Sequence, residues 1–279
     1  MGPSRGEGWG GLAVEGVLSK SVRDTAAALD AVGGDEAGAP YASPCAPASY
    51  VDLLGRDVEK PLRIAKWTSA FNDIPVAQEC LDAVEFAAAL LRRAGHEVVG
   101  APLPSVDYDE LVHAHVTVLM ANAYASIAGM VKGRDEASWK SSVEPAIFDA
   151  YKRGSELSAA QYIAAINTFH SVGRRMARGM KDFDLALTPT LTQLPALLGQ
   201  FSMTTDFWSF RRAVSKYTAF LTIINASVQP AASVPSYWTA AGLPVGVQLI
   251  GHFGREDQIL AAAAQIEKLA PWSGRMPNL

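Results

Sequence analysis

The 279-residue sequence has few of the features that mark a secreted or membrane-spanning protein. It contains only two cysteines, Cys45 and Cys80, which lie far apart and form no C-x-x-C motif. We therefore expect two reduced thiols in a cytoplasmic protein. The sequence has no uninterrupted run of about 18 apolar residues, so no membrane-spanning segment is predicted. It also lacks a basic segment followed by an apolar stretch at its start, so no signal peptide is expected.

An excess of charge of one sign is also missing. The sequence holds 24 lysines and arginines against 28 aspartates and glutamates, which gives a formal net charge of −4. Nucleic acids and anionic membrane surfaces select proteins with clustered basic residues. We therefore predict no nucleic-acid partner and no membrane partner. Apolar residues make up 49% of the chain, enough to bury a sizeable core.

Glycine, in contrast, is abundant in residues 2–11, which read GPSRGEGWGG. Residues 2–6 fit the G-x-S-x-G nucleophile elbow of hydrolases, and residues 6–11 fit the G-x-G-x-x-G fingerprint of dinucleotide-binding proteins. Both motifs require a strand directly before the turn. Because only three residues precede Ser4, neither interpretation is favoured. We interpret the stretch as a glycine-rich loop with special backbone angles or close packing.

Hydrophobic patterns typical of strands and helices alternate along the chain. Residues 62–67 alternate like a strand, residues 77–94 carry an apolar helical face, and residues 96–99 resemble the next strand. A helix that connects two strands in this way usually joins parallel strands. Further strands are predicted at residues 183–187 and 245–250. The pattern predicts an α/β fold with a mixed β-sheet flanked by helices.

Local signals define where several helices begin and end. Ser21 and Ser158 each begin an S-x-x-D or S-x-x-Q capping box, and Gly33 follows the first of these helices. Residues 38–61 carry four prolines with little periodicity, which indicates a surface loop. Helices are also predicted over residues 108–151, 207–224 and 257–269.

Side chains with catalytic chemistry are scattered. His113 and His115 are two residues apart and point in different directions on a helix, so a shared metal is not expected. Ser215 precedes Lys216, but adjacent helical residues do not face each other. The residues by themselves therefore predict no catalytic site, no metal site and no cofactor site.

Taken in order, several segments resemble the amidase signature family, which hydrolyses carbon–nitrogen amide bonds. The segments are GGLAVEGVLSKSVRDTAAALDAVGG, FDLALTPTL and NASVQPAASVPSYWTAAGLPVGVQLIG. The second resembles a family strand with its Thr-Pro-Thr loop, and the third a Pro-Ala-x-Ser-Val-Pro turn that leads to Gly-Leu-Pro-Val-Gly-Val-Gln. The resemblance covers residues 1–279 as a single domain. The form EGWGGLAVEG is most similar to bacterial amidases related to 6-aminohexanoate-cyclic-dimer hydrolase.

The resemblance also implies an incomplete domain. In the family, a nucleophilic serine, a second serine and a lysine lie in the N-terminal catalytic half, and no residue of this sequence matches those roles. The glycine-rich start resembles the loop that follows the catalytic core of a longer amidase. We therefore expect the fold to lack its N-terminal catalytic half and the chain to be inactive alone. The absent half would leave a sheet face and strand edges exposed, so self-association or a covering partner is expected.

Three hypotheses of function follow. The first is an amidase-family chain whose completed form hydrolyses a small amide by a Ser-Ser-Lys acyl-enzyme mechanism. The second is a non-catalytic binding or assembly subunit that needs a partner carrying the signature segment, and the third is an unrelated hydrolase that uses Ser4. The resemblance suggests Met120, Asn122 and Tyr124 as substrate-lining candidates. Core packing is the alternative for these three residues, and Met120 and Tyr124, four apart, can share a helix face.

Overall fold

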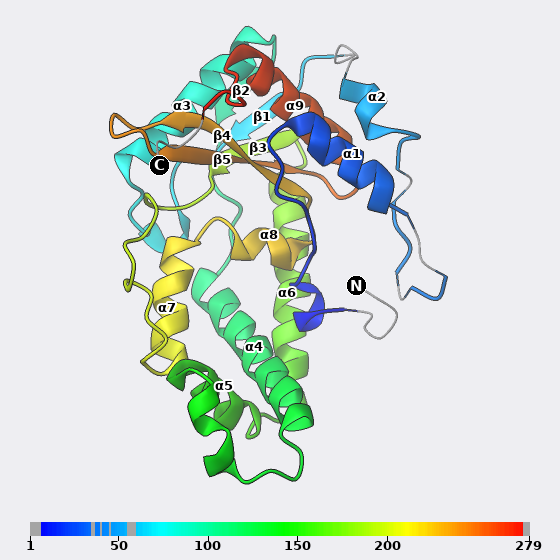
Figure 1. The fold of residues 1–279 in the computed structure, drawn as a ribbon. Helices are drawn as coiled ribbons and strands as arrows, with labels where there is room; N and C mark the ends of the chain where they lie inside the picture. Colours follow the sequence, from blue (N-terminus) through cyan, green and yellow to red (C-terminus); the bar gives the residue numbers. More distant parts are fainter. Residues whose placement is uncertain (1–6, 35–36, 40, 45, 55–59, 276–279) are drawn as a thin grey trace.

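The computed structural model of the chain describes residues 7–34, 37–39, 41–44, 46–54 and 60–275 (Figure 1). A five-stranded sheet in the order β2-β1-β3-β5-β4 forms its centre. β1 runs parallel to β2 and β3, whereas β5 runs antiparallel to β3 and β4. The predicted mixed sheet is therefore confirmed. The strands are β1 (Arg63–Lys66), β2 (Glu97–Gly100), β3 (Leu185–Pro189), β4 (Ala231–Trp238) and β5 (Pro244–Gly251).

Helices cover both faces of the sheet, and Figure 1 shows α4, α5 and α7 extending away from it. The α-helices are α1 (Val22–Val32), α2 (Tyr50–Leu54), α3 (Gln78–Arg93), α4 (Tyr108–Met130), α5 (Pro145–Gly154), α6 (Ala159–Gly179), α7 (Phe207–Tyr217), α8 (Thr222–Ser227) and α9 (Glu256–Leu269). The 3₁₀ helices are η1 (Trp9–Gly11), η2 (Phe71–Asp73), η3 (Glu136–Ser138) and η4 (Lys140–Ser142).

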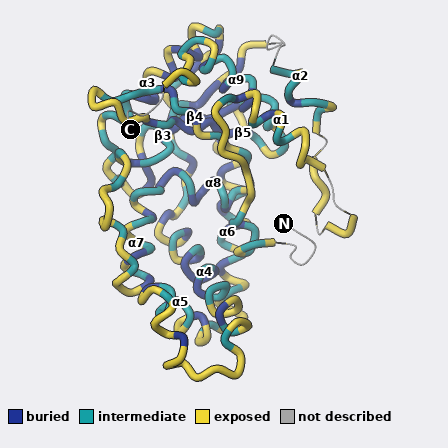
Figure 2. Tube along the Cα trace, in the orientation of Figure 1, coloured by how far each residue is buried: buried dark blue, intermediate teal, exposed yellow. Residues whose placement is uncertain are grey.

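Alternation along the strands determines which core each side chain joins. Ile64 packs into the apolar cluster of α1, α3 and α9, whereas its neighbour Ala65 joins the cluster of α4, α6 and α8 on the opposite face. In β3, Leu185 and Leu187 belong to the first cluster and Ala186 to the second. Successive strand residues point to opposite faces, so both faces are buried. Figure 2 shows the buried residues concentrated in and around the sheet and continuing into α4.

Both predicted capping boxes begin a helix. The Ser21 hydroxyl accepts a hydrogen bond from the Asp24 N–H at 3.1 Å, and α1 begins at the next residue. The Ser158 hydroxyl accepts from the Gln161 N–H at 3.2 Å, while the Gln161 side chain accepts from the Ser158 N–H at 2.9 Å. Each bond satisfies a backbone donor that the helix itself leaves free. The predicted helix starts are therefore confirmed.

The loop predicted over residues 38–61 is wrong in one part, because it contains α2. The Asp30 carboxylate accepts hydrogen bonds from the Tyr50 N–H at 2.6 Å and the Val51 N–H at 3.2 Å, and thus caps this helix from α1. These bonds hold the pKa of Asp30 below its ordinary value, with the bond from Tyr50 contributing most. A helix of five residues capped by a distant side chain leaves no periodicity in the sequence.

The turn predicted at Pro230–Pro235 is also wrong, because this segment enters β4. β4 pairs antiparallel with β5, and the register shifts between Val234 and Tyr237, next to Pro235. A proline is tolerated there because β4 is an edge strand with an irregular ladder. The long predicted helices are interrupted as well, by the segments 131–144 and 218–221.

The glycine-rich start is described only in part. Residues 2–6, including Ser4, lie outside the described residues, so the G-x-S-x-G interpretation has no structural counterpart here. Gly10 and Gly11 have φ angles of +62° and +88°. A Cβ on Gly10 would lie 2.4 Å from Ile166 Cδ1 in α6. For these two glycines the expected special backbone angles are confirmed, and Gly10 also packs closely.

α4 is the most apolar of the long helices that the structure describes, being the one long and apolar enough to be a candidate membrane span. By length and composition alone it could cross a membrane, although it contains no unbroken apolar run of that length. Its apolar 18-residue window is 44% buried inside the protein. Leu111 and Val118 are fully buried, and α4 packs against α5, α6 and α7. These contacts are those of a core helix.

Candidate functional site

The Thr-Pro-Thr and Pro-Ala-x-Ser-Val-Pro segments meet beside the central sheet. The hydroxyls of Thr190, which follows β3, and Ser233, in β4, share a hydrogen bond of 2.8 Å. Gly246 of β5 lies beside both: a Cβ there would be 2.7 Å from Ser233 Oγ and 3.1 Å from Thr190 Oγ1. The missing side chain of Gly246 therefore leaves room for this pair.

A buried glutamine supports the same region. Gln248 of β5 is 4% exposed, and its Nε2 donates to Thr188 Oγ1 at 3.2 Å and to the Phe220 carbonyl at 3.0 Å. It thereby connects β3, β5 and the segment before α8. The hydroxyls of Thr190 and Ser233 bond to each other rather than to a basic group, so neither is an activated nucleophile. These motif residues form a hydrogen-bonded contact between the loop after β3 and the strands β4 and β5.

A cleft of about 630 Å³ opens between α4 and α7, next to η2. Its position follows from the sheet, because β1 leads into η2 and ligands of open α/β sheets bind near the carboxyl ends of parallel strands. Its volume suits a small organic molecule. The lining residues are Asn72, Ile74, Tyr108, Asp109, Val112, His113, Trp208, Arg212, Ser215 and Lys216.

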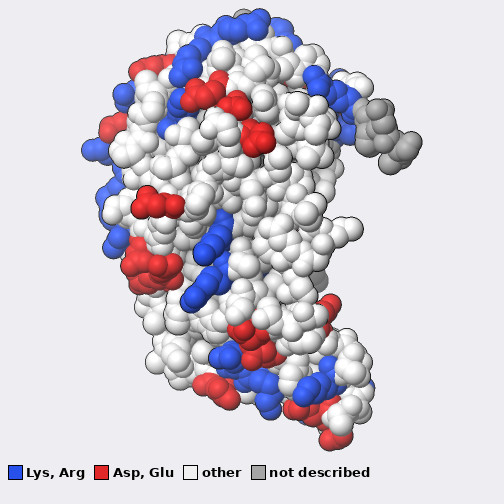
Figure 3. Space-filling model, turned by 90° about the vertical axis from the view of Figure 1, so that its left-hand side faces the viewer, with Lys and Arg blue, Asp and Glu red and all other residues white. Residues whose placement is uncertain are grey.

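The walls of the cleft are aromatic and predominantly basic. His113 of α4 stacks on Trp208 of α7, with ring centroids 5.1 Å apart. Arg212 and Lys216 lie along the α7 wall, and Asp109 is the acidic residue of the lining. Figure 3 shows a small group of basic side chains on the side of the molecule where α7 lies, with acidic ones around it. Such a lining suits a ligand that combines a planar or apolar part with a negative or polar group.

A half-buried polar group lies between α4, α7 and α8. The Tyr108 hydroxyl donates to the Ser215 carbonyl at 2.8 Å, and burial raises its pKa. Burial, together with the nearby Arg211 charge, lowers the pKa of His115 to about 3. Burial also lowers the pKa of Arg211, whose Nε is shielded from solvent and has no hydrogen-bond partner. The group therefore holds one guanidinium beside a neutral imidazole and a neutral phenol.

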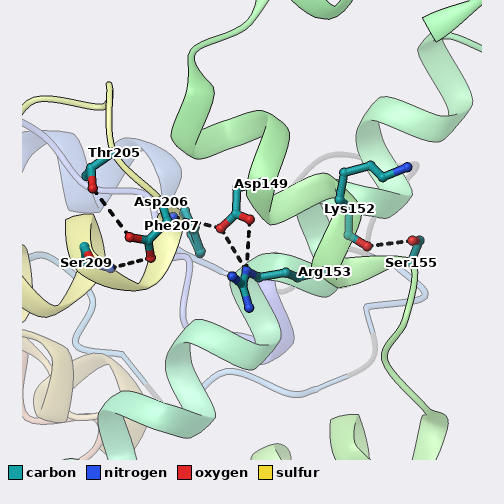
Figure 4. Close-up of polar contacts among 8 residues, drawn as sticks. All are labelled: Asp149, Lys152, Arg153, Ser155, Thr205, Asp206, Phe207 and Ser209. Carbon is teal, nitrogen blue, oxygen red and sulfur yellow. Dashed lines mark hydrogen bonds and ion pairs between the residues drawn. The ribbon is translucent and has the colours of Figure 1, made fainter.

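Two carboxylates accept hydrogen bonds from N–H groups at the start of α7 and so fix the helix that carries the basic wall of the cleft (Figure 4). The Asp149 carboxylate in α5 accepts from the Phe207 N–H and from Arg153 Nε, each at 2.9 Å. The Asp206 carboxylate accepts from the Ser209 N–H at 3.0 Å. Carboxylates at a helix N-terminus satisfy free N–H groups and complement the helix dipole.

The three substrate-lining candidates do not come together at the cleft. Met120 is 4% exposed and packs with Tyr124 against Gly154 of α5. The ring of Tyr124 also packs in a tilted arrangement against Tyr151 of that helix, with centroids 5.5 Å apart. The Asn122 side chain donates to the Val118 carbonyl within α4. Their role in substrate binding stays a prediction.

The structure gives no catalytic arrangement to the serine–lysine pair or to the cysteine that it describes. The Ser215 hydroxyl donates to the Arg212 carbonyl one turn earlier in α7 and not to Lys216. Burial raises the pKa of the free Cys80 thiol to about 11, and Cys45 lies outside the described residues. The part of the chain that the structure describes contains no group of three potential metal ligands.

Sequence reasoning missed the cleft, although one signal for it was present. Trp208, Arg212 and Lys216 are spaced four apart in a helical segment, which places them on one face. The opposite wall comes from α4, about a hundred residues earlier. No local pattern indicates that these two segments pack together.

The structure is an α/β fold with a mixed sheet and a cleft between α4 and α7, next to η2. The model of the Amidase family matches residues 9–260. The chain therefore belongs to the amidase signature family.

Two curated relatives are enzymes called 6-aminohexanoate-cyclic-dimer hydrolase, from Pseudomonas sp. (strain NK87) and Paenarthrobacter ureafaciens. Each is 29% identical over 96% of this chain but only 56% of its own length. A solved structure of 6-aminohexanoate cyclic dimer hydrolase complexed with substrate superposes with a TM-score of 0.81 at 28% identity, covering 92% of this chain and 55% of that one. A bacterial aryl acylamidase shares the fold, with a TM-score of 0.75 at 23% identity. The chain thus spans about half the length of the curated relatives that it matches.

Proposed function

We propose that this chain forms one part of an amidase that hydrolyses a small amide. The observation that carries the proposal is the match to 6-aminohexanoate-cyclic-dimer hydrolase, which extends over 96% of this chain but 56% of the relative. The structural superposition, with a TM-score of 0.81, supports the same conclusion. The remainder of the relative has no counterpart in the sequence described here.

The proposed reaction is acyl transfer to a serine. A lysine, acting through a second serine, removes the proton of the nucleophilic serine, which attacks the amide carbon. Backbone N–H groups stabilise the oxyanion, the amine leaves, and water releases the acid. We propose that the segment carrying these groups is supplied from outside the present sequence. The chain described here contributes the five-stranded part of the sheet and the cleft between α4 and α7.

The substrate that we propose is a small amide with an apolar acyl or amine part. The cleft volume of about 630 Å³ and its mixed aromatic and polar lining support this choice. The compound named in that relative, a cyclic dimer of 6-aminohexanoate, is itself a small amide. It is therefore the first compound to test.

We propose that the completing segment adds to the β4 edge of the sheet. Among the described strands, β2 and β4 are the two edges of the sheet; β4 pairs with β5 alone, and Ala231 and Ser233 are exposed along it. An unpaired strand edge is a template for another strand. Without the segment, we expect self-association through this edge or the apolar surface beside it.

The test is to complete the domain. The chain would be joined to the N-terminal part of 6-aminohexanoate-cyclic-dimer hydrolase that lies outside the matched region, and turnover of the cyclic dimer would be followed. We expect no turnover by the chain alone or by the added part alone, and turnover by the folded fusion. Replacing the nucleophilic serine of the added part by alanine should abolish it, whereas Ser19→Ala in this chain should not change it. Turnover by the rigorously purified chain alone, or a folded but inert fusion, would contradict the proposal.

A further inference from the structure

Arg211 carries a charge that no acidic group in the described residues neutralises. Its Nε is shielded from solvent and has no hydrogen-bond partner. The ion pairs of the structure join other side chains, namely Arg63–Glu97, Lys66–Glu85, Lys152–Glu136, Arg153–Asp149 and Arg255–Asp257. Removing a charge from water without a partner is costly, and proteins usually pair such a group or bind a ligand with it.

The neighbours of Arg211 cannot take the role of a counter-ion. His115, on α4, is neutral above a pKa of about 3. Tyr108, also on α4, is neutral as well and donates its proton to the Ser215 carbonyl of α7. Asp109 does not neutralise Arg211 either, because it lines the cleft and forms no ion pair with Arg211. From α8, Thr222 contributes a hydroxyl near Tyr108 and no charge.

The adjacent arginine shows that the position of Arg211 is unusual. Arg212 follows it in α7 but is exposed and lines the open cleft, where water can solvate its guanidinium. One helix therefore presents two arginines in sequence, Arg212 exposed and Arg211 partly buried with its Nε shielded from solvent and without a hydrogen-bond partner. This pair offers a test residue and a matched control in the same helix.

We propose that Arg211 is the receptor for a carboxylate supplied from outside the described residues. A guanidinium offers two parallel N–H donors to a carboxylate, a geometry that favours this anion over neutral groups. The carboxylate has two potential sources. One is the acid group of a small ligand, which, if the proposed amidase function holds, is an acid substrate end or the acid product. The other is an aspartate or glutamate of the segment that completes the domain.

The first arm uses the chain as it is and does not depend on amidase activity. Binding of hexanoate and of hexanamide, which differ in charge but hardly in shape, is measured by titration calorimetry. We expect hexanoate to bind the wild type about tenfold or more tightly than hexanamide, because the amide offers the guanidinium one neutral acceptor in place of two charged ones. Arg211→Gln should remove this preference, and Arg212→Gln should keep it within about twofold.

Two further measurements separate binding from folding. Melting curves establish that Arg211→Gln is folded, and Arg211→Lys, which keeps the charge but not the planar fork, should retain part of the preference. In NMR spectra at pH 7, where hexanoate is an anion, its addition should shift the ring resonances of His115, which lies near Arg211, in the wild type and in Arg212→Gln but not in Arg211→Gln.

The second arm distinguishes the two sources with the completed fusion. If hexanoate still binds there in an Arg211-dependent manner, the site takes a small-molecule carboxylate. If completion removes hexanoate binding and Arg211→Gln weakens the association of the two separately expressed parts about tenfold or more, the completing segment supplies the carboxylate. Equal binding of hexanoate and hexanamide by the wild-type chain, or a preference that survives in folded Arg211→Gln, would overturn the proposal. If the fusion is inert but still prefers hexanoate to hexanamide through Arg211, only the proposed amidase function is refuted.

Discussion

Gly154 of α5 lies directly against the carbonyl group of Met120 in α4. A Cβ at position 154 would be 2.1 Å from the Met120 oxygen and 2.8 Å from Tyr124 Cβ. The two helices therefore approach until their backbones touch, which only a glycine allows at this position. Because α5 also carries Asp149, which caps α7, this contact helps to fix the basic wall of the cleft.

We expect Gly154→Ala to destabilise the fold by about 1–3 kcal/mol, because the added methyl must push α4 and α5 apart. The matched control is Gly129→Ala near the end of α4, where a Cβ meets nothing within 4 Å. That change should be neutral or stabilising by up to about 1 kcal/mol, since alanine restricts the unfolded chain. Urea denaturation of both variants checks the prediction, and equal stabilities would show that the α4–α5 contact is not tight.

The cap that α5 provides for α7 gives a second prediction. Asp149→Ala should lower the free energy of unfolding by about 1–2 kcal/mol, because the Phe207 N–H loses its acceptor. Arg153→Ala, which removes only the half-exposed ion-pair partner of Asp149, should cost about 0–1 kcal/mol. Thermal unfolding would measure both. Equal losses would mean that the ion pair, and not the cap, carries the effect.

The structure also shows which features a single sequence can predict. The β1–α3–β2 unit was predicted because its signals are local: alternation, a helical apolar face and Gly95 at the break. The helix α2 was missed because its cap, Asp30, lies 20 residues away. Local patterns report the period of a segment and not the partner that holds it.

The site was less predictable for the same reason. The cleft depends on packing between α4 and α7, which only the fold brings together. Arg211 and Arg212 are adjacent and chemically identical, yet Arg211 is partly buried with a shielded, unpartnered Nε and Arg212 is exposed. The resemblance to amidases identified the family correctly. It also suggested Met120 as a substrate-lining residue, which stays a prediction; its side chain belongs to an apolar cluster shared with α5 and α7.

A third prediction concerns the pH dependence of stability. The pKa of His115 is about 3 in the folded protein, mainly because of burial, against about 6.5 in the unfolded chain. Between these values the unfolded state binds more protons, so the free energy of unfolding falls as the pH decreases from about 6.5 to about 3. The contribution of one such group has a slope of at most about 1.4 kcal/mol per pH unit.

His115→Gln should therefore flatten this acid limb, whereas His113→Gln should not, because His113 is exposed and lies in the open cleft. Urea denaturation at several pH values between about 4 and 7 provides the measurement, and the wild type serves as reference. Parallel curves for the wild type and His115→Gln would show that the imidazole titrates normally.

The last prediction tests the contact that joins the two family segments. Gly246→Ala should destabilise the protein by about 1–3 kcal/mol, because the new methyl would lie 2.7 Å from Ser233 Oγ and 3.1 Å from Thr190 Oγ1. Gly100→Ala in β2, where a Cβ meets nothing within 4 Å, is the matched strand control and should cost less. If the clash is the cause, removing the Ser233 hydroxyl should relieve part of it. In a double-mutant cycle, Gly246→Ala should therefore cost at least about 0.5 kcal/mol less in a Ser233→Ala background than in the wild type. If the costs of Gly246→Ala and Ser233→Ala simply add, then β4 and β5 can move apart at this point without strain. The Thr190–Ser233 hydrogen bond would then not depend on Gly246.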